Sequence, residues 1–194
     1  MESLNKKYKN CFSGKGVFPP KYAFTLLLPL RNIFLSPKKL IERLDLQEDY
    51  TVLEIGPGPG YFSVKVAKEL KKGKLVLADI QQEMLDYSRK RVEARKIQNV
   101  EYKLCNGHTL DFKDKSFERV FMVTVMGEVT NKREYLREIR RILKNDGMLS
   151  ISELAGDPDK LSTEELQDLV CSEGFKLTIL FGTKRNYTMN FKKL

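Results

Sequence analysis

The sequence has no long uninterrupted apolar run. The longest mostly apolar stretch, residues 22–35, is broken by Pro29, Arg31 and Asn32 and falls short of the roughly 20 residues that cross a bilayer. The first residues are polar and basic, and they lack the apolar core and small-residue cleavage site of a secretory signal. These absences argue against a transmembrane span and lead us to expect a cytoplasmic protein.

Cysteine is scarce, and its pattern indicates no metal site. Cys11, Cys105 and Cys171 are odd in number, far apart and in no Cys-x-x-Cys pair, which argues against a disulfide framework or a zinc knuckle. Three scattered thiols could converge on a soft ligand such as trivalent arsenic, but buried bystander cysteines are much commoner. We therefore interpret all three as structural.

Acidic residues are outnumbered, and the excess of positive charge lies at the N-terminus. The formal net charge is +9, of which residues 1–45 carry +6 and the remaining 149 residues +3. A basic arm beside an apolar segment suits nucleic acid, an anionic membrane surface or an acidic substrate, and it equally suits a plain solubilising surface. The sequence leaves these alternatives open, together with the oligomeric state.

From residue 51 onward, short apolar runs alternate with amphipathic segments in a chain whose length is typical of one domain. The alternation predicts an α/β fold: a doubly wound, mostly parallel sheet with helices on both faces and an antiparallel C-terminal hairpin. The expected strands are residues 51–55, 74–78, 100–104, 119–125, 148–152, 175–181 and 187–191. Five helices are expected. The first begins after a Ser36 cap with Pro37, and the next two cover residues 61–70 and 82–96. The fourth begins after an Asn131–Glu134 cap and ends at a turn at 145–147, and the fifth begins at a Ser162–Glu165 capping box.

The turn after the first strand is the main candidate site. Ligands of doubly wound sheets bind at the carboxyl ends of the strands, near the topological switch point. Here the strand at residues 51–55 leads into Gly56-Pro57-Gly58-Pro59-Gly60. Glycines permit positive φ and close approach of a ligand, and the helix behind the turn offers free N–H groups. Glycine spacing alone remains a weak signal.

Three residues near the turn favour S-adenosylmethionine over a dinucleotide. A pyrophosphate fingerprint needs Gly or Ala where Tyr61 stands, because a large side chain impedes close packing of helix on strand. The Glu54 carboxylate would repel a pyrophosphate but could receive the cationic methionine end of S-adenosylmethionine. Asp79, at the end of the second strand, can accept both hydroxyls of a ribose, with Ile80 against the adenine. Alone, an acid in that place is more often a helix cap.

The ordered motifs resemble those of class I S-adenosylmethionine-dependent methyltransferases, and among them the group similar to the ubiquinone and menaquinone biosynthesis methyltransferases. The resemblance covers roughly residues 36–194. Its first motif is matched at 52–60, its second at 77–85, and further stretches at 116–120 and 138–147. Residues 105–110 take the place of a Gly-Asp-Ala-x-x-Leu stretch that contacts the adenine amine, with Asn106 where Asp is usual; an amide can still accept that hydrogen bond.

The resemblance implies a seven-stranded sheet whose last strand is antiparallel. It also implies two parts of the chain, a basic and apolar lid at residues 1–35 and a cofactor-binding methyltransferase domain at residues 36–194. The cofactor would be S-adenosyl-L-methionine, held by Glu54, Gly56, Pro57, Gly58, Gly60, Asp79, Ile80, Met84, Asn106, Gly107 and Thr124.

A catalytic base is optional for this chemistry. Methyl transfer from a sulfonium is an in-line displacement, which is accelerated by alignment of the acceptor and exclusion of water. If the acceptor must lose a proton, the candidates at the ligand-facing edge are Glu128, Glu153 and His108. For His108 a place behind the cofactor or in solvent is favoured, and Glu128 could equally be an ordinary acid at a helix start.

The acceptor is the least specified part. Residues 124–129 do not resemble the Asn/Asp-Pro-Pro-Tyr signature that grips a flipped adenine, which disfavours nucleobase methylation. The aromatic and aliphatic content of residues 18–30 suits a small apolar or amphipathic acceptor, although ordinary packing on the core is the commoner reason for such a segment. We predict a small-molecule methyltransferase; RNA methylation and a non-catalytic cofactor-binding subunit of a complex are the alternatives.

Overall fold

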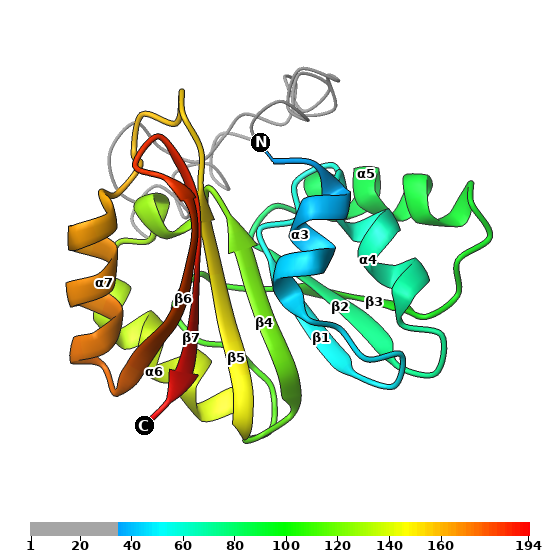
Figure 1. The fold of residues 1–194 in the computed structure, drawn as a ribbon. Coiled ribbons are helices and arrows are strands. Elements are labelled where there is room, and N and C mark those ends of the chain that lie inside the picture. The colour runs from blue at the N-terminus through cyan, green and yellow to red at the C-terminus, as the bar shows by residue number, and fades with distance from the viewer. Residues whose placement is uncertain (1–34) are drawn as a thin grey trace.

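The computed structural model describes residues 35–194, so the predicted lid at residues 1–35 lies outside the described residues except for Leu35. The described residues form one seven-stranded sheet in the order β3-β2-β1-β4-β5-β7-β6 (Figure 1). The strands are β1 (Thr51–Ile55), β2 (Lys74–Asp79), β3 (Val100–Leu104), β4 (Phe117–Val123), β5 (Leu143–Glu153), β6 (Phe175–Thr183) and β7 (Asn186–Lys193). The helices are α3 (Pro37–Leu44), α4 (Ser63–Glu69), α5 (Gln82–Glu93), α6 (Lys132–Ile142), α7 (Thr163–Ser172) and the 3-10 helix η2 (Met126–Glu128).

Strand direction matches the sequence prediction. Strands β1 to β5 pair in parallel with one another, and β7 is antiparallel to both β5 and β6. A parallel connection needs a long crossover, whereas antiparallel neighbours can be joined by a short turn. The predicted doubly wound sheet with a C-terminal hairpin is therefore confirmed.

Helices cover both faces of the sheet and divide the core in two. Because side chains alternate along a strand, Leu53 of β1 and Val120 of β4 pack with helices α6 and α7 on one face. Val52 and Phe121, one residue away on the same strands, pack with α3 and α4 on the other face. Both layers are visible in Figure 1, where α7 stands at the left beside β6 and α3 and α4 lie on the other side of the sheet.

Most helix boundaries follow the predicted caps. The side chains of Ser36 and Ser162 accept from the backbone N–H of Lys39 and Glu165 respectively, and Ser162 with Glu165 forms a complete capping box. At Asn131 the predicted position of the cap is confirmed, but the capping hydrogen bond is not formed. The Asn131 side chain instead donates to the Glu134 carboxylate at 3.2 Å, and α6 begins at the next residue.

Other differences arise where tertiary pairing overrides local signals. Helix α4 begins at Ser63 instead of residue 61, because the turn after β1 extends through Phe62. The predicted turn at residues 145–147 lies within β5 as an irregularity, since Leu143 pairs with Phe117 and Met148 pairs with Arg119. No helix within residues 35–194 is long and apolar enough to cross a membrane.

Candidate cofactor and acceptor site

A cavity opens at the carboxyl ends of β1, β2 and β4. The order of strands reverses between β1 and β4, so the cavity lies at the topological switch point where doubly wound sheets bind ligands. Its lining is Glu54, Ile55, Gly56, Pro57, Gly58, Pro59, Tyr61, Phe62, Ala78, Asp79, Ile80, Gln81, Met84, Cys105, Val123, Thr124, Val125, Glu128 and Tyr135.

The glycine turn is held close against two neighbouring strands. Gly56 has φ +65°, and its N–H donates to the carbonyl of Ala78 at 2.9 Å. A Cβ at Gly56 would approach Val125 Cγ2 to 2.6 Å. Since positive φ and this contact both disfavour a side chain, glycine at this position follows from the packing of the turn between β2 and the end of β4.

Gly60 has a packing role at the other end of the turn. A Cβ there, at φ +76°, would lie 3.0 Å from Ser88 Cβ on α5, and Gly60 is not among the lining residues. Tyr61 lines the cavity, and its ring meets that of Phe62 edge-on at 4.9 Å. The large side chain of Tyr61, which we expected to obstruct packing of the helix on the strand, thus forms part of the cavity wall.

Glu54 is anchored where β1 enters the turn. Its side chain is buried, and Oε2 accepts a hydrogen bond from the Ser63 hydroxyl at 2.6 Å. Ser63, the first residue of α4, is itself fully buried. The carboxylate is therefore fixed at the cavity edge by the first turn of the following helix.

Asp79 is the second buried acid of the cavity. Its Oδ1 accepts from the Gln81 backbone N–H at 3.0 Å. Burial raises the pKa of Asp79 to about 6, opposed by the backbone N–H groups of Gln81, Ile80 and Gly58, which favour the charged form. At neutral pH the group is a carboxylate, and its contact with Gly58 ties the glycine turn to the end of β2.

Apolar and weakly acidic side chains complete this end of the cavity. Ile80 and Met84 are both buried and line it. Burial raises the pKa of the Cys105 thiol to about 11 and also raises the pKa of the Tyr135 hydroxyl, so both stay protonated at neutral pH. Cys171 packs against the core on α7. No group of three or more His, Cys, Asp or Glu side chains within residues 35–194 is arranged to hold a metal ion.

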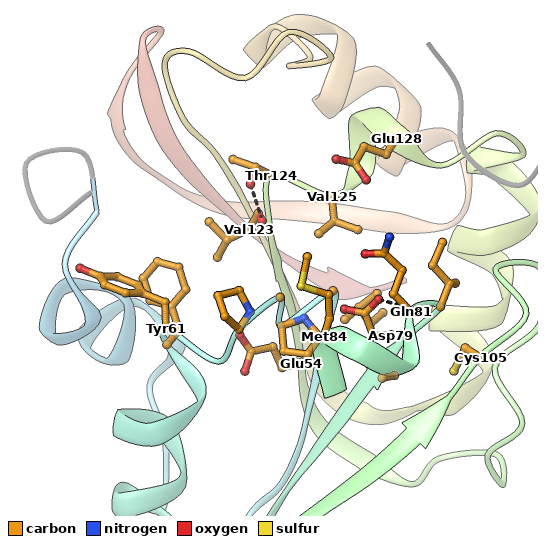
Figure 2. Close-up of a pocket in the computed structure, with 18 of the residues that line it drawn as sticks. Glu54, Tyr61, Asp79, Gln81, Met84, Cys105, Val123, Thr124, Val125 and Glu128 are labelled. Carbon is orange, nitrogen blue, oxygen red and sulfur yellow. Dashed lines mark hydrogen bonds between the residues drawn. The ribbon is translucent and has the colours of Figure 1, made fainter. Parts of the chain in front are cut away.

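The end of β4 supplies the opposite wall, with Val123, Thr124 and Val125 (Figure 2). Thr124 has φ +56°, a conformation that is rare for a β-branched residue and is found at functional turns. Its N–H donates to the Ser152 carbonyl at 2.8 Å and its hydroxyl to the Val123 carbonyl at 2.7 Å. The strained residue turns the chain so that the following segment faces the cavity.

Of the three candidate bases, only Glu128 lines the cavity. Burial raises the pKa of Glu128 to about 8, helped by the negative charges of Asp157, Asp159 and Asp79. Glu153 is 0% exposed and lies outside the lining. His108 is exposed and is also outside the lining.

The loop after β3 reaches the cavity at Cys105, whereas the next two residues, Asn106 and Gly107, lie outside the lining. Asn106 is exposed, and its Oδ1 accepts from the backbone N–H groups of His108 and Thr109 at 2.9 Å each. Gly107 is buried at φ +79°. Neither Asn106 nor Gly107 is a lining residue, because the Asn106 side chain closes its own turn.

Sequence reasoning missed several lining residues. Gln81 follows the recognised Asp79-Ile80 pair directly, so its place could have been inferred from the strand end. Tyr135 lies on the inward face of α6, but helical periodicity does not distinguish a core residue from a cavity residue. Val123 and Val125 look like ordinary strand residues, and only the strained Thr124 between them turns this wall toward the cavity.

Comparison with known proteins agrees with this fold and cavity. A family model described as a methyltransferase domain matches residues 46–191. The ubiquinone/menaquinone biosynthesis C-methyltransferase of Hydrogenovibrio crunogenus is 34% identical over 117 residues, which cover 59% of this chain and 46% of that protein. A Bacillus subtilis protein named as a methyltransferase, YrhH, is 32% identical over 139 residues, which cover 66% of this chain and 72% of that protein.

Among solved structures, a SAM-dependent methyltransferase from Aquifex aeolicus superposes with a TM-score of 0.86 at 23% identity, covering 92% of this chain and all of that one. The chain belongs to the methyltransferase domain family, within the class I S-adenosylmethionine-dependent methyltransferases. The cofactor of this class is S-adenosyl-L-methionine. The match spans about half the length of the Hydrogenovibrio relative.

Proposed function

We propose that this chain transfers a methyl group from S-adenosyl-L-methionine to a small apolar or amphipathic acceptor at the carboxyl ends of β1, β2 and β4. The observation that carries the proposal is the arrangement of the cavity walls. The glycine turn and Asp79 together form one wall, and Val123 and Val125 form an apolar wall that faces it. The Hydrogenovibrio relative is named a C-methyltransferase of quinone biosynthesis, which supports a small apolar acceptor.

The residues of the first wall fit the parts of the cofactor. Glu54 places a buried, anchored carboxylate beside the turn, which suits the cationic methionine end. Asp79 offers a second carboxylate, ionised at neutral pH, to the ribose hydroxyls. The tight cradle at Gly56, which a Cβ would fill, suits close approach of a ligand to the backbone. Ile80 and Met84 offer apolar surface to the adenine.

The chain's own contribution to the reaction is alignment and exclusion of water. When bound, the cofactor supplies a methyl carbon on a sulfonium, with a neutral thioether as leaving group. Tyr61, Phe62, Val123 and Val125 bring apolar surface to the cavity, so an acceptor held between them is shielded from solvent. We also propose that residues 1–35 act as a lid over this site, on the strength of their aromatic and aliphatic content.

The arginines of α6 give little support to RNA methylation. Their outward-facing guanidinium groups are engaged within the molecule instead of being presented as a patch: Arg133 and Arg137 with Glu173, Arg140 with the carbonyls of Gly174 and Leu194, and Arg141 with Glu138 and Asp114. Binding to RNA by phosphate contacts would fall steeply with salt. Salt-sensitive binding of a structured RNA at micromolar protein would favour this second function over the first.

Methyl transfer to a metabolite extract tests the proposal. The purified chain is incubated with methyl-labelled S-adenosylmethionine and a low-molecular-mass extract, in parallel with total RNA. We expect label in an organic-phase small molecule, and none in RNA. Label in RNA alone would contradict the acceptor class. Absence of transfer, with S-adenosylhomocysteine still bound, would favour a cofactor-binding subunit.

The lid is tested separately by deleting residues 1–34. We expect the shortened chain to keep its affinity for S-adenosylhomocysteine while losing transfer to the labelled acceptor. Full transfer by the shortened chain would contradict a lid.

A further inference from the structure

One carboxyl group of the cavity is not used to hold the cofactor in the proposed function. Glu128 lies on the wall formed by the end of β4, whereas Glu54 and Asp79 lie on the wall of the glycine turn and β2 (Figure 2). It lines the same cavity as these two acids. A carboxylate at this place can take up a proton from an acceptor atom.

We propose that Glu128 is the catalytic base of this enzyme, and that its acceptor therefore carries an ionisable proton on the atom that is methylated. The inference rests on the proposed methyl transfer. It deepens that function by naming a chemical class, acceptors with an acidic O–H, N–H or C–H group, and it excludes acceptors such as thioethers that have no proton to lose.

The backbone at Glu128 is fixed from several sides. The strained Thr124 turns the chain out of β4, and the Glu128 N–H donates to the Val125 carbonyl at 3.0 Å. The Lys132 ammonium donates to the carbonyls on both sides of Glu128, to Gly127 at 3.0 Å and to Val129 at 2.7 Å. Such support is what a catalytic side chain needs, because reacting groups must be held within a fraction of an ångström.

The loop after β5 packs directly on the same turn. A Cβ on Gly127 would collide with the backbone carbonyl of Asp159, so glycine permits the loop to lie against η2. This contact brings Asp159, and with it Asp157, within electrostatic reach of Glu128. The turn is thus clamped between a lysine of α6 and a loop that carries negative charge.

Charged groups from every neighbouring element act on Glu128. Asp157 and Asp159 face it from the loop and Asp79 from β2, and Glu153 of β5 is also within electrostatic reach. Lys132 of α6 interacts with Glu153 and Asp159, but its hydrogen bonds go to backbone carbonyls. Burial and these like charges raise the pKa of Glu128 to about 8, and a base with a pKa near the working pH is the most effective.

Protons and charge balance in this step. The acceptor atom loses its proton to a Glu128 carboxylate oxygen, and the electron pair left behind forms the bond to the methyl carbon. The bond from that carbon to sulfur breaks, and sulfur keeps the electron pair. A carboxylate and a sulfonium both become neutral, which a poorly hydrated cavity favours because it removes two desolvated charges.

The test compares Glu128→Gln with three other variants, and its substrate is the unmethylated extract compound that accepts the label. For the wild type we expect kcat/KM to rise tenfold per pH unit up to about pH 8. Glu128→Gln should lose roughly 100-fold or more at pH 8 and lose this rising limb. Glu128→Asp should keep the limb at a lower rate. Asp157→Asn, which removes a facing charge, should move the limb to lower pH.

Two readouts separate catalysis from structure. Isothermal titration with S-adenosylhomocysteine should give the same affinity for Glu128→Gln as for the wild type. In ¹³C-carboxyl-labelled protein, the signal lost in Glu128→Gln should titrate near pH 8. Glu93→Gln, an exposed change at the end of α5, is the matched control and should leave the rate, its pH profile and binding unchanged.

Each outcome bears on the proposal. An unaltered rate and pH profile in Glu128→Gln, with the wild type active, would overturn it while leaving methyl transfer intact. A Glu128 signal that titrates at the ordinary pKa of a glutamate would also overturn it. If the wild-type chain transfers no label to any small molecule, the proposed function fails and this inference fails with it.

Discussion

The two walls of the cavity are built in different ways. The wall of β1 and β2 is held together by backbone hydrogen bonds. The Gly56 N–H donates to the Ala78 carbonyl, and the Gly58 N–H donates to the Asp79 carboxylate. On the wall at the end of β4, side chains dominate, with Val123, Val125 and Glu128 facing the cavity. A wall made by backbone requires glycines at fixed spacing, whereas a wall made by side chains accepts many sequences.

That difference explains why the sequence indicates the cofactor but does not indicate the acceptor. The first wall specifies one ligand through strict packing, and its residues form a recognisable motif. The second wall is positioned by strain at Thr124 and by the loop after β5, and neither leaves a motif. Substitutions on the first wall should therefore affect cofactor binding, and those on the second should affect the acceptor step.

The largest effect is expected at Gly56. Gly56→Ala adds a Cβ that meets Val125 Cγ2 at 2.6 Å, at a φ of +65°. Backbone strain of about 1–3 kcal/mol and displacement of the turn should together weaken S-adenosylhomocysteine binding by roughly 100-fold. Isothermal titration measures this loss.

Gly156→Ala is the matched control for that change. Gly156 also has positive φ, at +92°, but no atom of the described part of the chain lies within 4 Å of a Cβ there. Gly156→Ala therefore introduces the backbone strain without a collision of the Cβ. Its affinity for S-adenosylhomocysteine should stay near the wild-type value. Equal losses in the two variants would show that general destabilisation, and not the packing of the turn, is responsible.

The next effect is expected at Asp79. Asp79→Asn removes the charged acceptor proposed for the ribose, and loss of a hydrogen bond to a charged group costs about 1.5–3 kcal/mol, or roughly tenfold to 100-fold in affinity. Because the pKa of Asp79 is raised to about 6, wild-type affinity should fall as pH drops from 7.5 to 5 and the carboxylate is protonated.

Titrations at several pH values check this sign. The Asp79→Asn variant should show no such pH dependence, and Asp86→Asn, an exposed change on α5, should behave like the wild type. Wild-type affinity that is constant or increases toward pH 5 would contradict the assignment of Asp79.

Behind the second wall, Glu153 should affect stability more than activity. Among residues 35–194, both of its carboxylate oxygens are buried without a hydrogen-bond partner, and burial raises its pKa to about 8 from an ordinary 4.5. The folded state binds the proton more tightly, so stability from this group is complete below pH 4.5 and is lost as pH rises through 8. Between pH 4.5 and 7 the loss amounts to up to about 3 kcal/mol.

Urea unfolding across this pH range measures the effect. With rising pH, the free energy of unfolding should fall less steeply for Glu153→Gln than for the wild type. The difference between the two slopes should correspond to about one proton. Glu93→Gln should follow the wild-type curve. A steeper decline in Glu153→Gln would contradict a neutral, buried carboxyl.

The smallest effect is expected at Asn106, where the family pattern has Asp. The three acceptor contacts of its Oδ1, to the N–H groups of His108 and Thr109 and to the Thr109 hydroxyl, can be made by a carboxylate. Asn106→Asp should change S-adenosylhomocysteine affinity by less than about threefold, as surface substitutions usually do. A tenfold change in titration would show that the residue 106 side chain reaches the ligand.

Sequence patterns predicted the sheet and the first wall well. Alternation of apolar runs and amphipathic segments specified all seven strands, because both elements need a buried face. The patterns failed where distant contacts decide, as at the irregular start of β5, where pairing with Phe117 extends the strand through a predicted turn. They could not separate Glu128 from Glu153, since both follow strands and only the strained turn at Thr124 directs one of them to the cavity.

A comparison of two ligands by isothermal titration tests the central claim most directly. S-adenosylhomocysteine and NAD⁺ are titrated separately into the purified wild-type chain. The account predicts one molecule of S-adenosylhomocysteine bound per chain and no heat from NAD⁺, because Glu54 and Tyr61 stand where a pyrophosphate would need a neutral, open turn. Binding of NAD⁺ with no binding of S-adenosylhomocysteine would contradict it.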